Sequence, residues 1–362
     1  MLHHGRRGIL GKPAVAESEA VAAMQNGGTT PIVYKWSASG FGTRYATAST
    51  TTGSTYKCAF SPDGKALAVL HGTSPFITAY AFNAVTGCGA KYSNPATLPV
   101  EGDGSLIFSP AGDAVLFSQY TDPFVAAYRW DSTTGFGTKY ANPATALTST
   151  GSSISMSPDG TAVVIGCFDT PRVNGYQWSS ASGFGTRYTN PTTPPNNGSE
   201  NDTTAFSPSG NAVVVGSVQS PFVYAYPWNS VTGFGTKYAD PSTALIASIF
   251  GATFSRSGNA IILLGGSGSV GGYIAAYAFN ATTGFGTKYA NPVGMTGAMY
   301  DVGIQASVLS ALGDTVFFGG RATPYIHAYP WSDATGFGTK HADPTSLPTN
   351  RIRGLAFRKI PV

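Results

Sequence analysis

The chain has 362 residues and a formal net charge of +4, and only 10% of its residues are charged, against roughly 25% in an average soluble domain. Its 46 glycines and 24 prolines stay below the fraction typical of disordered chains, so the composition indicates a packed, turn-rich protein with a polar surface of few ions. No apolar run reaches the roughly 18 residues of a membrane-spanning helix, so membrane insertion is not expected.

Residues 1–18 precede the first predicted strand and form a candidate N-terminal extension. They lack the apolar core of a secretory signal. Basic residues gather here and near the other end of the chain, at Arg6, Arg7, Lys12, Arg351 and Arg353. We predict a docking head that orders against an acidic partner, and a frayed terminus is the alternative.

A short sequence motif, for example "TGFGTKYANP" at 134–143, recurs along the whole chain; we call it the phrase. Its leading glycines are Gly40, Gly87, Gly135, Gly183, Gly233, Gly284 and Gly336. Successive gaps of 47, 48, 48, 50, 51 and 52 residues predict a repeat architecture. Because the repeats fill almost all of the chain, we expect one domain over residues 19–362.

One unit, residues 203–238, predicts four strands. "TTAF" leads through a "SPSG" turn into the apolar run "NAVVVG", then the alternating "FVYAYPW", and finally "FGTKY". Similar turns recur at 61–64, 109–112, 157–160, 255–258 and 310–313. Four antiparallel strands about every 48 residues are typical of a propeller blade, so the predicted fold is all-β, a single seven-bladed β-propeller.

Two features recur in every unit. The third strand carries an aromatic pair, as at Tyr128/Trp130, which we expect to pack against the next blade; a row for stacking sugars is the alternative. The phrase carries one basic residue, namely Arg44, Lys91, Lys139, Arg187, Lys237, Lys288 or Lys340. We expect these charges to prevent association between the exposed outer edges of the sheets. Because they are spread evenly around the ring, they argue against a nucleic-acid partner.

The seventh blade is predicted to be split between the chain ends. "RGLAFRKI" near the C-terminus resembles the opening strand of a unit, and residues 19–46 supply the other three strands. We therefore expect residues 353–362 to pair with the N-terminal strands and close the ring.

The segment "FSPDGKALAVLHGTSPFITAYAF" (60–82), followed by "NPATLP" (94–99), resembles the WD-repeat-like propellers, especially a variety encoded in bacteriophage genomes. The resemblance covers residues 31–358. It implies a seven-bladed ring used as an interaction platform, on a virion in the case of the phage variety.

The residues predicted to line the central funnel offer little chemistry. In the opening strands Lys57 and Arg353 stand alone as titratable groups, whereas acid–base catalysis needs two groups together and a metal needs three or four donors. We expect no catalytic residues, no metal and no cofactor. The five histidines, His3, His4, His71, His327 and His341, have no metal-binding spacing and are expected to be structural or solvent-exposed.

The loops between second and third strands, and the connectors between blades, lie on one rim and differ in sequence between units. We predict a binding rim there, because large or charged groups in Gly/Ser/Thr loops are plausible anchors. Its candidate residues are Tyr120, Asp122, Phe168, Asp169, Met295, Met299, Tyr300 and Arg321.

The leading hypothesis from sequence is a non-enzymatic bacteriophage virion protein, associated with the tail or capsid and made in the host cytoplasm. Its expected partners are other virion proteins, with a host-surface protein or glycan at the rim. The first alternative is a lectin-like carbohydrate-binding propeller. The second is a lactonase-like propeller enzyme.

Overall fold

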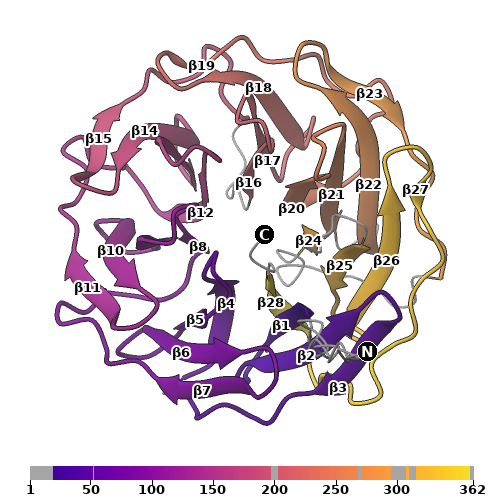
Figure 1. The fold of residues 1–362 in the computed structure, drawn as a ribbon. Coiled ribbons are helices and arrows are strands. Elements are labelled where there is room, and N and C mark those ends of the chain that lie inside the picture. The colour runs from indigo at the N-terminus through magenta and orange to yellow at the C-terminus, as the bar shows by residue number, and fades with distance from the viewer. Residues whose placement is uncertain are drawn as a thin grey trace, which may run out of the picture.

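The computed structural model describes residues 19–51, 53–196, 203–267, 271–294, 307–309 and 315–358. Within these ranges every regular element is a β-strand, and no helix is present that could cross a membrane. The strands form seven four-stranded antiparallel sheets, which Figure 1 shows as a ring around a central axis. The predicted seven-bladed β-propeller is confirmed.

We number the complete blades 1 to 6 in chain order and the split blade 7. The first strand of each blade lies nearest the axis and the last lies outermost (Figure 1). Blade 1 is β4 (Thr55–Phe60), β5 (Ala66–His71), β6 (Ile77–Asn83) and β7 (Gly87–Lys91). Blade 2 is β8 (Leu106–Phe108), β9 (Ala114–Ser118), β10 (Val125–Asp131) and β11 (Gly135–Lys139). Blade 3 is β12 (Gly151–Met156), β13 (Ala162–Cys167), β14 (Val173–Ser179) and β15 (Gly183–Arg187).

The remaining blades follow the same order. Blade 4 is β16 (Thr204–Phe206), β17 (Ala212–Gly216), β18 (Val223–Asn229) and β19 (Gly233–Phe234). Blade 5 is β20 (Ser248–Phe254), β21 (Ala260–Ser267), β22 (Gly271–Asn280) and β23 (Gly284–Lys288). Blade 6 is β24 (Ser307–Leu309), β25 (Thr315–Gly319), β26 (Ile326–Ser332) and β27 (Gly336–Phe337). Blade 7 is β28 (Ile352–Arg358), β1 (Glu19–Gln25), β2 (Ile32–Ser37) and β3 (Gly40–Arg44).

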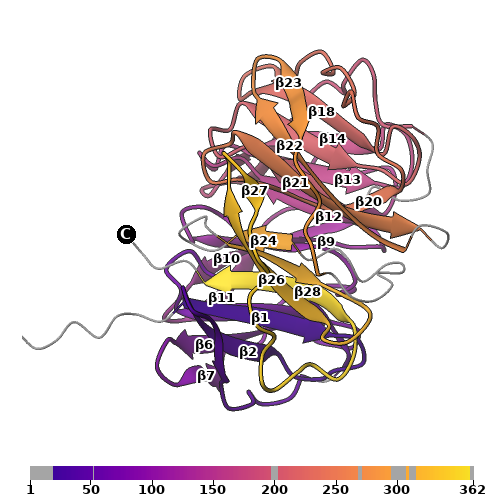
Figure 2. The same ribbon diagram turned by 90° about the vertical axis from the view of Figure 1, so that its right-hand side faces the viewer.

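Blade 7 joins the two ends of the chain. β28 pairs antiparallel with β1, from Arg358 opposite Ala20 to Ile352 opposite Gln25, and Figure 2 shows the two strands side by side. Beyond the strands, the backbone N–H of Asn26 donates to the carbonyl of Arg351 at 2.9 Å. The predicted closure of the ring is therefore confirmed, and residues 359–362 of the predicted closing segment lie outside the described residues.

The S-P-x-G turns fold as predicted, as hairpins between the first and second strands. In blade 1 the backbone N–H of Ser61 donates to the carbonyl of Ala66, and the N–H of Ala66 donates back to Ser61 Oγ, both at 3.0 Å. Gly64 ends the turn with φ +66°, a conformation that favours glycine. These turns lie on the rim that also carries the turns between third and fourth strands.

The third-strand aromatic pairs pack between blades, as expected, but the neighbour is the preceding blade rather than the next. Tyr128 and Trp130 of blade 2 share a buried cluster with Ala66 and Ala68 of blade 1. The tyrosine of the pair is fully buried in every blade. The rings of Tyr140 and Phe184 meet Trp178 edge-on, 5.1 and 5.0 Å away between centroids. These rings are core residues and leave no open row on which sugars could stack.

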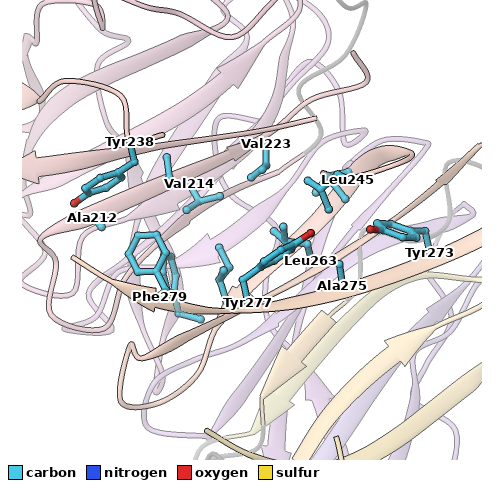
Figure 3. Close-up of a cluster of buried hydrophobic side chains, with 14 of the residues drawn as sticks. Ala212, Val214, Val223, Tyr238, Leu245, Leu263, Tyr273, Ala275, Tyr277 and Phe279 are labelled. Atoms are coloured by element: carbon cyan, nitrogen blue, oxygen red, sulfur yellow. The ribbon is translucent and has the colours of Figure 1, made fainter. Parts of the chain in front are cut away.

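The aliphatic side of each third strand faces the following blade. Figure 3 shows such a cluster between blades 4 and 5, in which Val214 and Val223 meet Leu263 and Tyr277. Each blade therefore buries an apolar surface on both sides, which explains why its inner strands are apolar almost without interruption.

The repeated phrase forms a lock between consecutive blades. The tyrosine that ends one phrase packs over the leading glycine of the next: a Cβ added at Gly183 would lie 2.9 Å from the ring of Tyr140. The same tyrosine donates from its hydroxyl to the carbonyl of Ser180 at 2.7 Å. The hydrogen bond recurs at Tyr45, Tyr92, Tyr188, Tyr238 and Tyr289. The phrase is repeated because each copy has to fit the copy before it.

The basic residue of the phrase has a local partner in four blades. Lys340 pairs with Asp343 at 2.6 Å, Lys288 donates to Asn291 Oδ1 at 2.8 Å and Arg187 to Asn190 Oδ1 at 3.0 Å. Lys237 likewise pairs with Asp240. Besides occupying the outer edge, these side chains hold the start of the connector that leads to the next blade.

The loops between second and third strands are more alike than their sequences predict. In five blades the loop has a cis peptide bond before proline, and the residue after that proline has a positive φ; these residues are Phe76, Phe124, Arg172, Phe222 and Tyr325. The loops share one backbone path, and what differs between blades is the side chain carried on it.

Candidate functional site

A central channel of about 780 Å³ runs along the axis at the end that carries the S-P-x-G turns. Its described walls come from the inner strands β4, β8, β12, β16, β20 and β28 and from the turns that follow several of them. These walls combine apolar side chains, among them Ile107 and Met156, with polar ones, among them Ser109 and Thr253. The channel itself offers no ionisable pair among its described residues.

At the opposite end of the inner strands two cations come together. Lys57 on β4 donates from Nζ to the backbone carbonyl of Arg353 on β28, at 2.9 Å. The guanidinium of Arg353 lies 4.6 Å from the ring centroid of Tyr56, a cation–π contact that holds its orientation. Because β28 closes the ring beside β4, the two positive charges of blades 7 and 1 share one edge of the channel mouth.

A connector brings carboxylates to these cations. The segment Glu101-Gly102-Asp103-Gly104 leads from blade 1 into β8. A Cβ added at Gly102 would lie 2.4 Å from the carbonyls of His71 and Phe76, and one at Gly104 would lie 2.0 Å from the carbonyl of Ser118. Only glycine permits this close approach of two backbones, so the glycines set where the neighbouring acids lie.

A side chain of blade 2 fixes the same connector. Gln119, which is fully buried, donates from Nε2 to the carbonyl of Glu101 at 2.9 Å. Glu101 itself has a buried carboxylate oxygen, Oε2, without a hydrogen-bond partner.

The carboxyl of Asp103 has a shifted pKa. Burial raises the pKa of the Asp103 carboxyl above its ordinary value. The positive charge of Arg353 lowers the pKa of Asp103, and that of Lys57 does so to a smaller extent. The negative charge of Glu101 raises the pKa of Asp103. Asp103 thus interacts with groups from blades 7 and 1, and its carboxyl exchanges its proton nearer to neutral pH than an exposed aspartate would.

The arrangement can therefore perform acid–base chemistry on a polar substrate. A carboxylate with a raised pKa is suited to take a proton from water, and two fixed cations beside it can stabilise a developing oxyanion. In the described parts of the segments predicted to line the funnel, Lys57 and Arg353 do stand alone, as predicted, but the connector adds Glu101 and Asp103 to their surroundings. The prediction considered the inner strands only, whereas the acids arrive on a connector.

The predicted rim residues do not gather into one site. The rings of Tyr120 and Phe168 contact each other at 5.5 Å between centroids, while Asp122 and Asp169 are exposed and Arg321 is partly buried. Met295, Met299 and Tyr300 lie outside the described residues. The rim nevertheless carries Glu101 and Asp103, which sequence reasoning missed; the signal was two acids alternating with two glycines just before an inner strand.

The predicted docking head is divided in the same way. Arg6, Arg7 and Lys12 lie outside the described residues. Arg351 donates to Asn26 Oδ1 at 3.3 Å across the closure of blade 7, and Arg353 belongs to the channel mouth.

The described histidines do not join the site. His71 and His327 are buried, and desolvation lowers the pKa of each imidazole to about 4. His71 Nε2 lies 2.9 Å from Thr78 Oγ1, within its own blade. His341 packs against Trp36 in place of the tyrosine that ends the phrase elsewhere. Among the described residues no group of three His, Cys, Asp or Glu side chains could hold a metal ion.

Comparison with known proteins gives a fold likeness only. No protein-family model matches the chain, and no curated protein matches it by sequence. The periplasmic gluconolactonase of Pseudomonas aeruginosa has a similar structure, with a TM-score of 0.68 and 15% identity over 95% of this chain and 100% of that one. A Bacteroides fragilis protein assigned as a 6-phosphogluconolactonase gives 0.68 and 13%, over 96% and 99%.

A functionally unknown protein from Desulfotomaculum acetoxidans is similar to the same degree, with a TM-score of 0.66 and 11% identity over 94% of this chain and 99% of that chain. At such identities the likeness shows a common fold over the full length. The resemblance to the bacteriophage variety of WD-repeat-like propellers is not confirmed by any of these matches.

These findings contradict the prediction of a non-enzymatic bacteriophage virion protein. The activities that the similar structures name are lactonases, and virion, structural and host-attachment roles have no support. That prediction considered the inner strands only and left out Asp103, whose carboxyl interacts with the charges of Arg353 and Lys57. The lactonase-like alternative is the better supported one, while the expected partners and location stay untested predictions.

Proposed function

We propose that this protein is an enzyme that hydrolyses lactones at the mouth of its central channel. The observation that carries the proposal is the charge interaction of Asp103, on the connector from blade 1 to blade 2, with Arg353 of blade 7 and Lys57 of blade 1, which are themselves joined by the hydrogen bond from Lys57 Nζ to the backbone carbonyl of Arg353. The cluster holds both a titratable carboxylate and fixed positive charge, which are the two requirements of acyl hydrolysis without a covalent intermediate.

Each residue has a role in this scheme. The carboxylate of Asp103 takes a proton from a water molecule as its oxygen attacks the lactone carbonyl carbon. Lys57 and Arg353 stabilise the oxyanion that forms there. When the ring C–O bond breaks, the departing alkoxide takes the proton back from Asp103, and the product is a hydroxy acid. Glu101 is a positioning residue whose charge helps to keep the pKa of Asp103 raised.

The fold neighbours support the reaction class. Two similar propellers carry the names gluconolactonase and 6-phosphogluconolactonase, so lactones are the first substrates to try. Since a common fold hosts many activities, the proposal depends on the cluster and not on the likeness. The WD-repeat-like ancestry of the chain rests on its S-P-x-G turns and also stays a proposal.

The test is proton release from lactones in a pH-stat, corrected for spontaneous hydrolysis. We expect the wild-type chain to hydrolyse at least one of glucono-1,5-lactone, its 6-phosphate and δ-valerolactone. Asp103→Asn should lower kcat/KM by about 10²- to 10⁴-fold, the usual contribution of a general base. Absence of wild-type turnover on all three lactones would refute the proposal.

A matched control removes a carboxylate elsewhere. Asp131 is exposed on the opposite rim and accepts hydrogen bonds from the backbone N–H groups of Thr133 and Thr134. Asparagine does the same at the equivalent Asn229. Asp131→Asn should therefore leave both fold and activity unchanged. If Asp131→Asn lowers kcat/KM as much as Asp103→Asn does, the loss in Asp103→Asn is not evidence for a general base.

A further inference from the structure

The connector that carries Asp103 is held on both sides by two consecutive side chains of blade 2. Ser118 is the last residue of β9 and Gln119 follows it, and both are fully buried. Before Asp103, Gln119 Nε2 donates to the backbone carbonyl of Glu101 at 2.9 Å. After it, the backbone N–H of Ser105 donates to Ser118 Oγ, also at 2.9 Å. The carboxyl group therefore lies in the middle of a segment that is fixed at either end.

The backbone of the same two residues is anchored as well. The N–H of Ser118 donates to the carbonyl of Ser105 at 3.0 Å. The N–H of Gln119 donates to the carbonyl of Phe124 at 2.7 Å, and the carbonyl of Gln119 accepts from the N–H of Gly151 in blade 3 at 2.9 Å. Because Gln119 is tied to its own blade and to the following one, its side-chain amide holds the connector from a fixed position.

Two other blades use the corresponding position differently. His71 of blade 1 and Ser217 of blade 4 correspond to Gln119, since each donates its backbone N–H to the residue after the loop proline. His71 Nε2 lies 2.9 Å from Thr78 Oγ1, and Ser217 Oγ accepts from the backbone N–H of Gln219 at 3.2 Å. Both of these side chains bond within their own blade, whereas Gln119 bonds to the incoming connector. This difference indicates that Gln119 serves to place the connector.

The place of the connector decides how Asp103 titrates. Burial is the largest influence on this carboxyl and raises its pKa. The charge of Glu101 also raises the pKa, the charges of Arg353 and Lys57 lower it, and the two side chains of blade 2 carry no charge. If the connector moved toward solvent, the carboxylate would regain its water and the pKa of Asp103 would return toward the ordinary aspartate value.

Resting on the lactone hydrolysis proposed above, we propose that Ser118 and Gln119 are positioning residues, which hold the connector so that the carboxyl of Asp103 keeps its partly buried place. Gln119 acts through the carbonyl of Glu101, and Ser118 acts through the N–H of Ser105. Neither side chain takes part in the reaction itself. A residue that merely filled the interior of blade 2 would affect stability but not the titration of Asp103.

The pKa of Asp103 is measured without turnover, by NMR of the aspartate side-chain carboxyl carbons, with the signal assigned by its absence in Asp103→Asn. Gln119→Met keeps the length of the side chain but removes the amide that donates to Glu101. We expect the pKa of Asp103 to fall by at least about half a unit, toward the ordinary value of about 3.9. Gln219→Met, the same change at an exposed loop position of blade 4, should leave it unaltered. A pKa that stays the same or rises in folded Gln119→Met overturns the proposal.

Ser118→Ala is a second variant, because it removes only the oxygen that accepts from Ser105. It should shift the pKa of Asp103 in the same direction. If thermal unfolding shows that Gln119→Met does not fold, Ser118→Ala decides the question, and an unchanged pKa in this variant overturns the proposal.

Turnover separates this inference from the proposed function. The acidic limb of kcat/KM for lactone hydrolysis reports the pKa of the general base in the free enzyme. If that limb moves to lower pH in Gln119→Met together with the carboxyl signal, both proposals are supported. Wild-type turnover with an unshifted limb in the variant leaves the proposed function standing and overturns the inference. A lowered pKa of Asp103 in a chain that hydrolyses no lactone supports its placement by blade 2 and refutes the lactone hydrolysis.

Discussion

At the scale of single residues, Asp103 combines a functional use with a cost in stability. Its raised pKa means that the folded state holds the proton more tightly than the unfolded chain. Above the ordinary aspartate range the unfolded state therefore loses its proton first, and folding stability falls as pH rises toward the raised pKa. Residues placed for function commonly destabilise the fold in this way.

We therefore predict that Asp103→Asn is more stable than wild type at pH 7. The difference should shrink as pH falls through the raised pKa and vanish below the ordinary aspartate value, where both forms are neutral. Urea unfolding at several pH values measures this. A variant less stable than wild type at pH 7 would show that the carboxylate is not destabilised by burial.

The buried histidines predict the opposite dependence. His71 and His327 have pKa values lowered to about 4, so between pH 6.5 and 4 the unfolded state takes up protons that the folded state does not. Stability should fall as pH decreases through this window, by up to about 3 kcal/mol per histidine. In His327→Ala, with alanine as at Ala126 of blade 2, the slope of unfolding free energy against pH should be smaller; an unchanged slope contradicts the assignment.

The site shows what sequence could and could not supply at this scale. Lys57 and Arg353 were predicted at the funnel because strand position fixes them. Asp103 was missed because its place depends on Gly102 and Gly104 packing against distant backbone, so the alternation of acids and glycines before β8 does not by itself show where the carboxylates lie. Propensity and periodicity describe elements, whereas this connector is positioned by tertiary contacts.

At the scale of elements, the repeated phrase explains how blades keep their spacing. The strands and turns of each unit were predictable from alternation and from the S-P-x-G sequence. The lock between Tyr140 and Gly183 was not, because it joins residues of two phrases that face each other only after the blades have packed. The shared path of the cis-proline loops was likewise hidden behind their differing sequences.

Alanine substitutions at two glycines separate the cost of losing the Tyr140–Gly183 contact from the cost of a positive φ alone. Gly183 and Gly27 both have positive φ, +85° and +73°, but a Cβ at Gly27 meets nothing within 4 Å while one at Gly183 meets Tyr140. Alanine at Gly27 should cost about 1 kcal/mol for the left-handed conformation. Alanine at Gly183 should cost clearly more in denaturant unfolding; equal costs would contradict the lock.

At the scale of the whole molecule, the ring is closed by the pairing of β28 with β1, and this pairing also delivers Arg353 to the channel mouth. The period of the repeats made the ring and its closure predictable. The predicted virion role was wrong because it was inferred from the resemblance of the S-P-x-G turns to those of other propellers. Motifs that specify a fold do not specify chemistry.

Removal of the closing strand tests the ring. A chain lacking residues 353–362 should expose the edge of β1 and the apolar faces of its neighbours, and we expect it to aggregate. Light scattering and thermal unfolding distinguish the outcomes. A soluble, cooperatively unfolding truncation would show that the ring does not depend on β28.

The central claim is that charges from separate blades act as one site, and a double-mutant cycle in lactone hydrolysis tests it most directly. Arg353→Gln changes only the side chain, since Lys57 bonds to the backbone carbonyl of Arg353. We predict that Arg353→Gln and Asp103→Asn each lower kcat/KM by about 100-fold or more, and that the double variant loses far less than the product of the two. Losses that multiply would show that the two residues act independently and would contradict a shared site.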